Sequence, residues 1–414
     1  MKIAIIGGGA AGFFAAINIL EQCPTADVTI YEASSQPLAK VGVSGGGRCN
    51  LTNTFAQIGD LSEAYPRGAK LMRGLFKTFD NQSTVEWFES RGVELVTQPD
   101  ECLFPKSQSS QEIIDTFGRL LAKLGGGLKS SHRVSAISPL SDGGYRVSFV
   151  DAKLADIYVD TVVVTTGGSP KIEGLSMLDG LDLQFELPVP SLFTFNTPHR
   201  EIRELMGAVV DPAMLSIQGT KFLATGALLL THWGLSGPAA LKLSSYAARY
   251  LDEKEYKAIV VINWVCQRDN DRVHSELLRL LSENQGRLIT NIRPFGLPSR
   301  VWEMLLRRAE IPHERRCVEV GSKGVNRLVN RLTNDQYEMD GQSRFREEFV
   351  TCGGVSLKSI NPATMEARKH PNLYFAGEVV DVDAITGGFN LQAAWSMGFV
   401  VVQSIIAKLG GAES

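Results

Sequence analysis

Short apolar runs separated by glycines predict a β-α-β unit at the start of the chain. Residues 2–6, KIAII, are almost uniformly apolar, as in a strand buried on both faces. A glycine-rich turn follows, and FFAAINILEQ then has the length and composition of a helix. DVTIYE, at 27–32, reads as a second buried strand. The unit closes within about thirty residues, as parallel strands joined by a crossover helix do.

The same texture continues to about residue 188. SSQEIIDTFGRLLAKLGG is an amphipathic helix that stops at glycine, and SSHRVSAISPL predicts a strand. Residues 145–168 predict a hairpin followed by a buried strand that ends in TTGG. We therefore assign 1–188 to the first part of one α/β domain.

The pattern changes at 189 and changes back near the C-terminus. Short apolar runs with frequent turn signals predict an antiparallel, β-rich part, and a helical period follows at about 269–335. From 346 to 414 a strand, a glycine loop and a long apolar helix return. The predicted fold is α/β: a discontinuous Rossmann-type domain, 1–188 and 346–414, with a β-rich and helical substrate domain inserted at 189–345.

Composition and charge narrow the class of protein. The 414 residues include 42 basic and 45 acidic side chains without a basic patch, so we expect neither nucleic acid nor a membrane as a partner. Six scattered cysteines form no CxxC pair, which indicates a reducing cytoplasm and no zinc site. Three glycines interrupt the N-terminal apolar run, so we expect no cleaved signal, and no uninterrupted apolar stretch reaches 18 residues.

Gly7-x-Gly9-x-x-Gly12 lies between a predicted strand and a predicted helix, where a dinucleotide loop belongs. In such loops the first glycine allows the turn, the second lets backbone approach a pyrophosphate, and the third lets helix and strand pack closely. Glu32 ends the second strand and is placed to bind the adenosine ribose hydroxyls, which also disfavours a 2′-phosphate there. The alternative is a glycine turn with a surface glutamate.

The C-terminal stretch FAGEVVDVDAITGGFNLQAAW favours FAD over NAD as the dinucleotide. Glu378 follows a strand-ending glycine, Gly377, and a second glycine pair opens a helix near Asn390. The N–H groups of Asn390, Leu391 and Gln392 at this helix start would stabilise negative charge on a reduced flavin. The alternative is an amphipathic helix with a glycine cap.

GGGRCNLTN, at 45–53, combines three glycines with polar side chains. The glycines let backbone lie against a flat ring or a phosphate, Arg48 can bind a phosphate or carboxylate, and Cys49 and Asn50 could face the flavin. The alternative is a glycine turn with a solvated arginine. No second cysteine lies nearby, which disfavours a catalytic thiol at Cys49.

These motifs, together with TTGG, THWGLSGPA and TCGGV, resemble a family of bacterial flavoproteins that includes aminoacetone-oxidase-like and dehydro-bile-acid-reductase-like members. The resemblance spans nearly the whole chain and implies noncovalent FAD. Ala384 and Phe389 depart from the family's expected glycine and tyrosine, which leaves the substrate open. The FAD contacts so predicted, with Val134 acting through its backbone beside the adenine, are Gly7, Gly9, Ala10, Ala11, Gly12, Glu32, Ala33, Lys40, Gly47, Arg48, Cys49, Asn50, Val134, Thr166, Gly377, Glu378, Asn390 and Leu391.

His232, in LLLTHWGLSGPA, is the candidate acid–base catalyst, because histidine can move a proton at neutral pH. The alternative is a structural histidine at a strand end. Asp381 and Asp383 could form a carboxylate pair, but capping and shaping of their loop is the favoured reading, and no metal is expected.

The sequence therefore predicts an FAD-dependent oxidoreductase that acts on a small molecule by hydride transfer. No second strand–GxGxxG–helix unit is found, so any NAD(P)H is expected as a transient co-substrate that shares the substrate's cleft. The alternatives are an oxygen-using oxidase of an amine-type substrate, a nicotinamide-dependent enzyme on the same fold, and a flavin-binding protein without catalysis. The last would be a redox-responsive partner protein or an RNA-modification accessory, and the lack of a basic patch disfavours RNA. Substrate, nucleotide preference and oligomeric state stay open.

Overall fold

The computed structural model describes residues 1–341 and 350–411. The chain forms two compact units, one of Met1–Pro190 with Glu347–Ser414 and one of Ser191–Arg346. The first boundary, at 190/191, lies two residues beyond the predicted 188/189, and the predicted boundary at 345/346 lies outside the described residues.

A five-stranded parallel sheet forms the centre of the first unit, in the order β19-β10-β1-β2-β6. Its middle strand is β1, and both its neighbours are in register with it from end to end. The five strands are β1 (Lys2–Ile6), β2 (Asp27–Tyr31), β6 (Gly127–Lys129), β10 (Thr161–Val164) and β19 (Leu373–Phe375).

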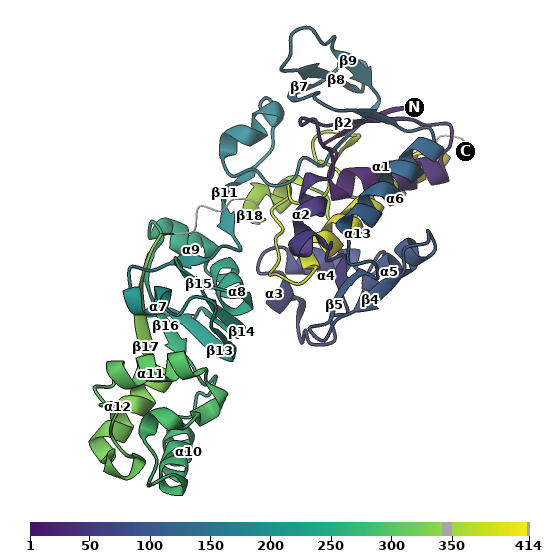
Figure 1. The fold of residues 1–414 in the computed structure, drawn as a ribbon. Helices are drawn as coiled ribbons and strands as arrows, with labels where there is room; N and C mark the ends of the chain where they lie inside the picture. The colour runs from purple at the N-terminus through teal and green to yellow at the C-terminus, as the bar shows by residue number, and fades with distance from the viewer. Residues whose placement is uncertain (342–349, 412–414) are drawn as a thin grey trace. The chain divides into compact units, whose positions relative to one another are not determined.

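Two long apolar helices pack side by side in this unit, α1 (Ala10–Gln22) and the 23-residue α13 (Phe389–Gly411) (Figure 1). Phe14 of α1 meets Trp395 of α13 and Trp87 with ring centroids 5.4 and 4.8 Å apart. α13 is long and apolar enough to cross a membrane, but the buried core helix of a soluble protein can have the same length and composition. Trp395 is fully buried, so α13 serves here as a core helix.

Smaller elements surround the central sheet. Three-stranded antiparallel sheets are formed by β3 (Thr52–Asn53), β5 (Cys102–Pro105) and β4 (Leu95–Thr97), and by β7 (Val134–Pro139), β8 (Tyr145–Phe149) and β9 (Ile157–Val159). A two-stranded sheet joins β11 (Phe185–Ser191) to β18 (Val350–Val355). The remaining helices are α2 (Ala39–Gly47), α3 (Leu61–Ala64), α4 (Ala69–Leu75), α5 (Asn81–Glu89), α6 (Ser110–Lys123), η1 (Ile172–Leu178) and η5 (Leu357–Ser359).

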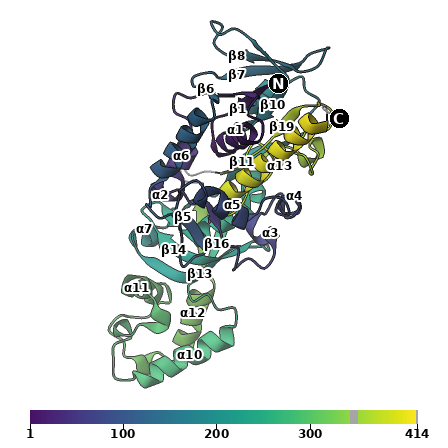
Figure 2. The same cartoon turned by 90° about the vertical axis from the view of Figure 1, so that its right-hand side faces the viewer.

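The second unit has a β part and a helical part. Its six-stranded sheet has the order β12-β15-β14-β13-β16-β17, and every neighbouring pair of strands is antiparallel. Figure 2 shows β13, β14 and β16 of this sheet. The strands are β12 (Phe195–Asn196), β13 (Val209–Ile217), β14 (Leu223–Leu230), β15 (Gly234–Ser236), β16 (Lys257–Asn263) and β17 (Asp335–Asp340).

The β part of this unit also contains helices that the sequence did not predict. Near the sheet lie α7 (Arg200–Arg203), α8 (Pro238–Tyr246) and α9 (Ala248–Glu253). The helical part contains α10 (Asn270–Glu283), η2 (Ile289–Asn291), η3 (Pro294–Gly296), α11 (Ser299–Arg308), η4 (Cys317–Glu319) and α12 (Ser322–Thr333). The predicted fold class is confirmed: a discontinuous Rossmann-type domain carries an inserted β-rich and helical domain.

Candidate functional site

The glycine loop between β1 and α1 has the geometry that a dinucleotide requires. A Cβ atom on Gly7 would lie 2.5 Å from the Thr165 carbonyl oxygen, and one on Gly12 only 2.1 Å from the Gly7 oxygen. At Gly9 the nearest atom would be 4.0 Å away, so this position faces open space. Two glycines are therefore needed for packing, and the third leaves room for a ligand, as the roles of a pyrophosphate loop demand.

The start of α1 adds unpaired backbone donors to this loop. Gly9 is the N-cap residue, and among the described residues no side chain caps this helix end. The first N–H groups of a helix have no partner within the helix and carry its positive dipole end. Predicted contacts Ala10 and Ala11 lie in this first turn, so the loop fits the pyrophosphate of FAD.

Glu32 lies directly beside the glycine loop at the end of β2. Its Oε2 atom accepts a hydrogen bond from Gly8 N and its Oε1 atom from Ser34 N, both at 2.7 Å. The His132 N–H donates to the Glu32 carbonyl oxygen at 2.8 Å, which brings the chain leading to Val134 to the same strand end. These contacts fix the carboxylate where the ribose of an adenosine would meet it, next to Ala33.

Two further loops reach the glycine loop from β10 and β19. Thr166 follows β10, and a Cβ atom on Gly7 would lie 2.8 Å from its Cα atom. Gly377 follows β19, and a Cβ atom there would lie 3.2 Å from the Cβ of Ala11. The carboxyl ends of the neighbouring parallel strands β19, β10 and β1 thus meet at one edge of the sheet, where α/β proteins bind ligands.

Glu378 is held by two neighbours at this edge. It pairs with Lys40 at 2.7 Å and accepts a hydrogen bond from Thr351 N at 2.7 Å. Lys40 is largely exposed, with 60% of its side chain accessible, so it can turn toward a ligand at little cost. The structure therefore brings together two predicted contacts that lie 338 positions apart in the sequence.

The GGGRCNLTN stretch forms a glycine turn, but its arginine is not freely solvated. Gly45, Gly46 and Gly47 belong to the end of α2, but all have positive φ, from 57° to 82°, so the glycines form a left-handed turn. Arg48 lies over the Phe104 ring, 4.2 Å from its centroid, and its Nε donates to the Gly45 oxygen at 3.1 Å. The alternative of a freely solvated arginine is therefore wrong.

Asn50 and Asn53 hold the glycine pair that opens α13. With its amide oriented to satisfy both neighbours, Asn50 donates to the Thr52 oxygen at 3.0 Å and accepts from Gly388 N at 3.2 Å. Asn53 donates to the Gly387 oxygen at 3.1 Å. Asn50 and Asn53 thus hold the loop at Gly387 and Gly388 in place through hydrogen bonds. We call these contacts the clasp.

A buried hydrogen-bond network fixes the first turns of α13. The Gln392 Oε1 atom accepts from the hydroxyls of Thr52 at 2.6 Å and Thr84 at 2.8 Å, and its amide donates to Ser396 at 3.0 Å. Ser396 in turn donates to the Phe79 oxygen at 2.8 Å. The backbone N–H of Gln392 donates to the Gly388 oxygen at 3.0 Å, so the prediction that it would face the flavin is wrong. Because these groups are buried and paired, the helix start that carries Asn390 and Leu391 is held rigidly.

Sequence reasoning missed two residues that brace the loop before α13. Tyr65 is fully buried and donates to the Phe389 oxygen at 2.9 Å. Two guanidinium nitrogens of Arg67 donate to the Asp383 carboxylate, with Nε 2.5 Å from Oδ1. The Asp383 side chain is fully buried. Asp383 therefore shapes its loop, as the sequence reading favoured. No local pattern in AYPRGAK pointed to either contact.

His232 and metal binding are the remaining sequence predictions. His232 lies in the second unit between β14 and β15, is exposed, and packs edge-on against Trp233 with ring centroids 4.4 Å apart. Its catalytic role stays a prediction. Within the described part of the chain, no three histidine, cysteine or acidic side chains are grouped as metal ligands would be.

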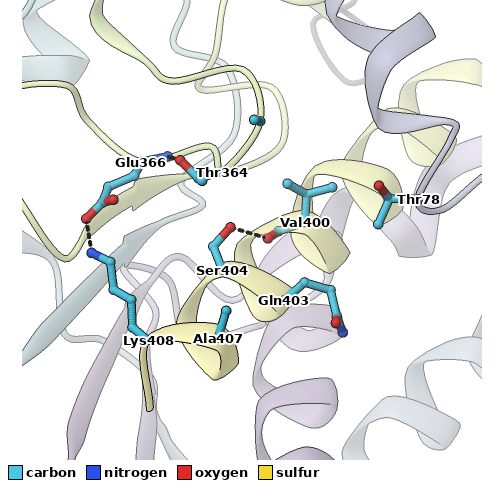
Figure 3. A pocket seen from close by; sticks show the side chains of 9 residues that line it. Thr78, Thr364, Glu366, Val400, Gln403, Ser404, Ala407 and Lys408 are labelled. Atoms are coloured by element: carbon cyan, nitrogen blue, oxygen red, sulfur yellow. Dashed lines mark hydrogen bonds and ion pairs between the residues drawn. The ribbon is translucent and has the colours of Figure 1, made fainter. Parts of the chain in front are cut away.

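A separate hollow of about 430 Å³ lies along the far half of α13 (Figure 3). Val400, Gln403, Ser404 and Ala407 line it, and Lys408 pairs there with Glu366. Val400 is ten residues beyond Asn390, or about 15 Å along the helix. This hollow is therefore distinct from the candidate FAD site at the helix start.

We expect Cys49 to resist alkylation in the folded protein. Its side chain is fully buried, and burial raises the pKa of the thiol to about 12. At pH 8 only roughly one thiol in ten thousand would be the reactive thiolate. Iodoacetamide labelling followed by peptide mass mapping should modify partly exposed Cys23 before Cys49, and labelling of both at equal rates would contradict the buried placement.

The Glu32→Ala variant should release FAD more readily while staying folded. It removes charged hydrogen bonds to the ribose, worth about 1.5–3 kcal/mol, or roughly ten- to hundredfold in affinity. Fluorescence titration of the apoprotein with FAD measures this, and circular dichroism checks the fold. Exposed Glu94, paired only with Lys106 at 2.7 Å, supplies a matched control as Glu94→Ala. Equal FAD affinity in both variants would contradict the assignment of Glu32.

The fold and this edge of the sheet define a Rossmann-type flavoprotein. The chain belongs to the family described as "HI0933-like protein Rossmann domain", whose model matches residues 1–404. It is therefore an FAD-dependent oxidoreductase of that family, as the resemblance of its motifs implied.

Relatives match over nearly their whole length. A ribosomal RNA dihydrouridine synthase of Escherichia coli (strain K12) is 30% identical over 418 residues, covering 97% of each chain. A 3-dehydro-bile acid delta(4,6)-reductase of Clostridium scindens is 26% identical over 412 residues, covering 96% of this chain and 97% of that protein.

Solved structures share the fold at low identity. A 3-ketosteroid delta1-dehydrogenase from Sterolibacterium denitrificans superposes with a TM-score of 0.52 at 12% identity, covering 98% of this chain and 99% of that one. A 3-ketosteroid-delta4-(5alpha)-dehydrogenase from Rhodococcus jostii RHA1 gives 0.50 at 14%, covering 98% and 97%. At these identities the likeness concerns architecture alone.

Proposed function

We propose that this protein reduces a carbon–carbon double bond conjugated with a carbonyl group, and that its substrate is uridine in ribosomal RNA. The observation that carries the proposal is the braced start of α13 beside the dinucleotide loop, in a chain that matches a named ribosomal RNA dihydrouridine synthase from end to end.

The names of the two relatives share one type of chemistry. Dihydrouridine is uridine with hydrogen added across carbons 5 and 6, a bond conjugated with the carbonyl at carbon 4. A delta(4,6)-reductase of a 3-dehydro bile acid likewise acts on double bonds conjugated with a carbonyl. Hydride addition to such a bond places negative charge on the carbonyl oxygen, so one mechanism serves both substrates.

FAD, when bound, would supply the hydride. The chain's own residues would do the rest at the sheet edge. Glu32 would bind the ribose, the first N–H groups of α1 the pyrophosphate, and the N–H groups of Asn390 and Leu391 negative charge on the reduced ring. Asn50, Asn53 and Gln392 would keep that helix start in place, because their partners are already fixed in the folded chain.

We propose NAD(P)H as the source of electrons and the cytoplasm as the site of action. The sequence contains one GxGxxG unit, so a nicotinamide nucleotide would bind transiently and leave before the second half-reaction. All six cysteines are free, which suits a reducing compartment, and ribosomal RNA is found there.

The test is single-turnover reduction under anaerobic conditions. FAD-loaded protein is mixed with NADPH or NADH, the flavin absorbance is followed, and deproteinised bacterial ribosomal RNA is then added. We expect bleaching, reoxidation by the RNA, and nucleosides heavier by two hydrogens on mass spectrometry. Bleaching without reoxidation by RNA, but with reoxidation by a conjugated steroid ketone, would replace RNA with a small molecule as the substrate.

A small molecule is the second candidate because the bile-acid reductase covers the chain as fully as the RNA enzyme does. The sequence analysis favoured it on the whole-chain charge of −3. The oxidase alternative would be favoured if neither nucleotide bleaches the flavin and if oxygen rapidly reoxidises flavin that a substrate has reduced.

A further inference from the structure

Positive charge is concentrated in one segment of the second unit. Residues 287–331 carry ten basic and four acidic side chains, whereas the rest of the chain carries 32 basic and 41 acidic ones. This segment therefore has a net charge of +6, although the net charge of the whole chain is −3. The basic residues are Arg287, Arg293, Arg300, Arg307, Arg308, Arg315, Arg316, Lys323, Arg327 and Arg331.

Two of these ten form ion pairs with buried or partly buried carboxylates. Arg308 pairs with Glu201 at 2.6 Å and with Asp335 at 3.0 Å, and Arg331 lies 3.4 Å from the same Asp335. The Asp335 carboxylate is fully buried, so these cations neutralise it. The other eight side chains are exposed, and none forms an ion pair with a carboxylate of the described residues.

Three exposed arginines lie where two chain segments run side by side. Leu288 and Arg316 form an antiparallel bridge, flanked by hydrogen bonds from Ile289 N to the Arg315 oxygen and from Cys317 N to the Arg287 oxygen, both 2.9 Å. Backbone pairing thus places Arg287 next to Arg315 and Arg316. We call these three residues, with Arg293 on the adjoining hollow, the arginine ridge. Along the chain it lies between α10 and α12, the two helices labelled in Figure 1.

The hollow beside the ridge has a polar lining. It measures about 680 Å³ and is lined by Leu288, Thr290, Asn291, Arg293, Ser299, Glu303, His313 and Glu314. The Nε2 atom of His313 is buried and has no hydrogen-bond partner among the described residues. Hydroxyl, amide and imidazole groups suit ribose hydroxyls and base edges, while Glu303 and Glu314 would keep phosphates out on the ridge.

We propose that the arginine ridge binds the phosphate backbone of RNA and so recruits the RNA substrate. Arginine binds phosphate through a planar fork of donors, and contacts to phosphate supply most of the affinity for nucleic acid. The uncharged polar groups beside the ridge favour RNA over an acidic protein surface. This proposal rests on the proposed function, because it assigns RNA as the substrate of the same enzyme.

The test compares two triple variants of the FAD-loaded full chain. Arg287→Gln/Arg293→Gln/Arg315→Gln removes three ridge charges and spares Arg316, whose side chain also donates to the Gly286 oxygen. Lys123→Gln/Lys153→Gln/Lys171→Gln removes three exposed charges of the first unit as a control. Binding of deproteinised bacterial ribosomal RNA is measured by fluorescence anisotropy at several salt concentrations.

We expect the ridge variant to bind RNA at least about tenfold more weakly at low salt. The slope of log affinity against log salt should fall by about 2–3, one phosphate contact per lost charge, while the control changes little. FAD content and nicotinamide-driven bleaching should match wild type in both variants. If the two variants have equal RNA affinity and an equal salt dependence of that affinity, the ridge does not bind RNA.

Failure of the ridge and failure of the proposed function are separable. Wild-type protein that reduces uridine in RNA, with a ridge variant that binds RNA normally, would overturn the ridge alone. If the wild-type protein reduces no uridine but the ridge variant binds RNA more weakly, RNA binding by the ridge stands and the proposed reaction is wrong. Binding to assembled ribosomal subunits but not to the naked RNA would assign the surface to a protein and overturn the ridge.

Discussion

The Arg67→Met variant is expected to lose about 3–5 kcal/mol of free energy of unfolding, the usual cost of removing one partner of a buried ion pair. The Asp383 side chain is fully buried, and Arg67 holds both its oxygens. Without the guanidinium, a carboxylate in the loop before α13 would lose its neutralising charge. The midpoint temperature of thermal unfolding should fall by roughly 10 °C.

A surface pair provides the matched control for Arg67. Arg73 pairs with Asp60 at 2.7 Å, but 57% and 54% of these side chains are exposed, so Arg73→Met should cost about 0–1 kcal/mol. The double variant Arg67→Met/Asp383→Leu should recover much of the lost stability, because it removes the buried charge as well. Equal unfolding temperatures for Arg67→Met and Arg73→Met would contradict a structural role for the buried pair.

The parts of the site that sequence could predict are those written in adjacent residues. The turn of Gly7 to Gly12, the acid at the end of β2 and the glycine pair before α13 follow local rules of strand, turn and helix. Each rule depends on spacing within about twenty-five residues, which a single sequence displays directly. The discontinuous fold was also predictable, since strand and helix texture returns after the insertion.

The parts that sequence could not predict are contacts between distant segments. Arg67 meets Asp383 across 316 positions, and the clasp of Asn53 on Gly387 spans 334. No periodicity or spacing records such pairs, because they depend on how the sheet orders its strands. The arginine ridge was overlooked for another reason: the whole-chain charge averages a basic segment with an acidic remainder. A count taken over the segment 287–331 alone would have found it.

The Gly388→Ala variant should disrupt the start of α13 and with it the retention of FAD. A Cβ atom on Gly388 would lie 2.5 Å from the Thr52 oxygen and 2.6 Å from the side-chain amide of Asn50, and the backbone there has a φ of +87°. The left-handed backbone costs about 1–2 kcal/mol for a residue with a Cβ, and the overpacking about 1–3 more.

Relief of this clash requires the clasp of Asn50 to open, which would move the helix start away from the flavin ring. About 3 kcal/mol lost from that arrangement corresponds to a roughly hundredfold weaker affinity for FAD. Gly46→Ala separates the two causes, since φ there is +68° but no atom lies within 4 Å of the added carbon. It should show only the backbone cost. FAD titration and thermal unfolding of both variants measure the difference, and similar values for the two would mean that the clasp does not position the helix start.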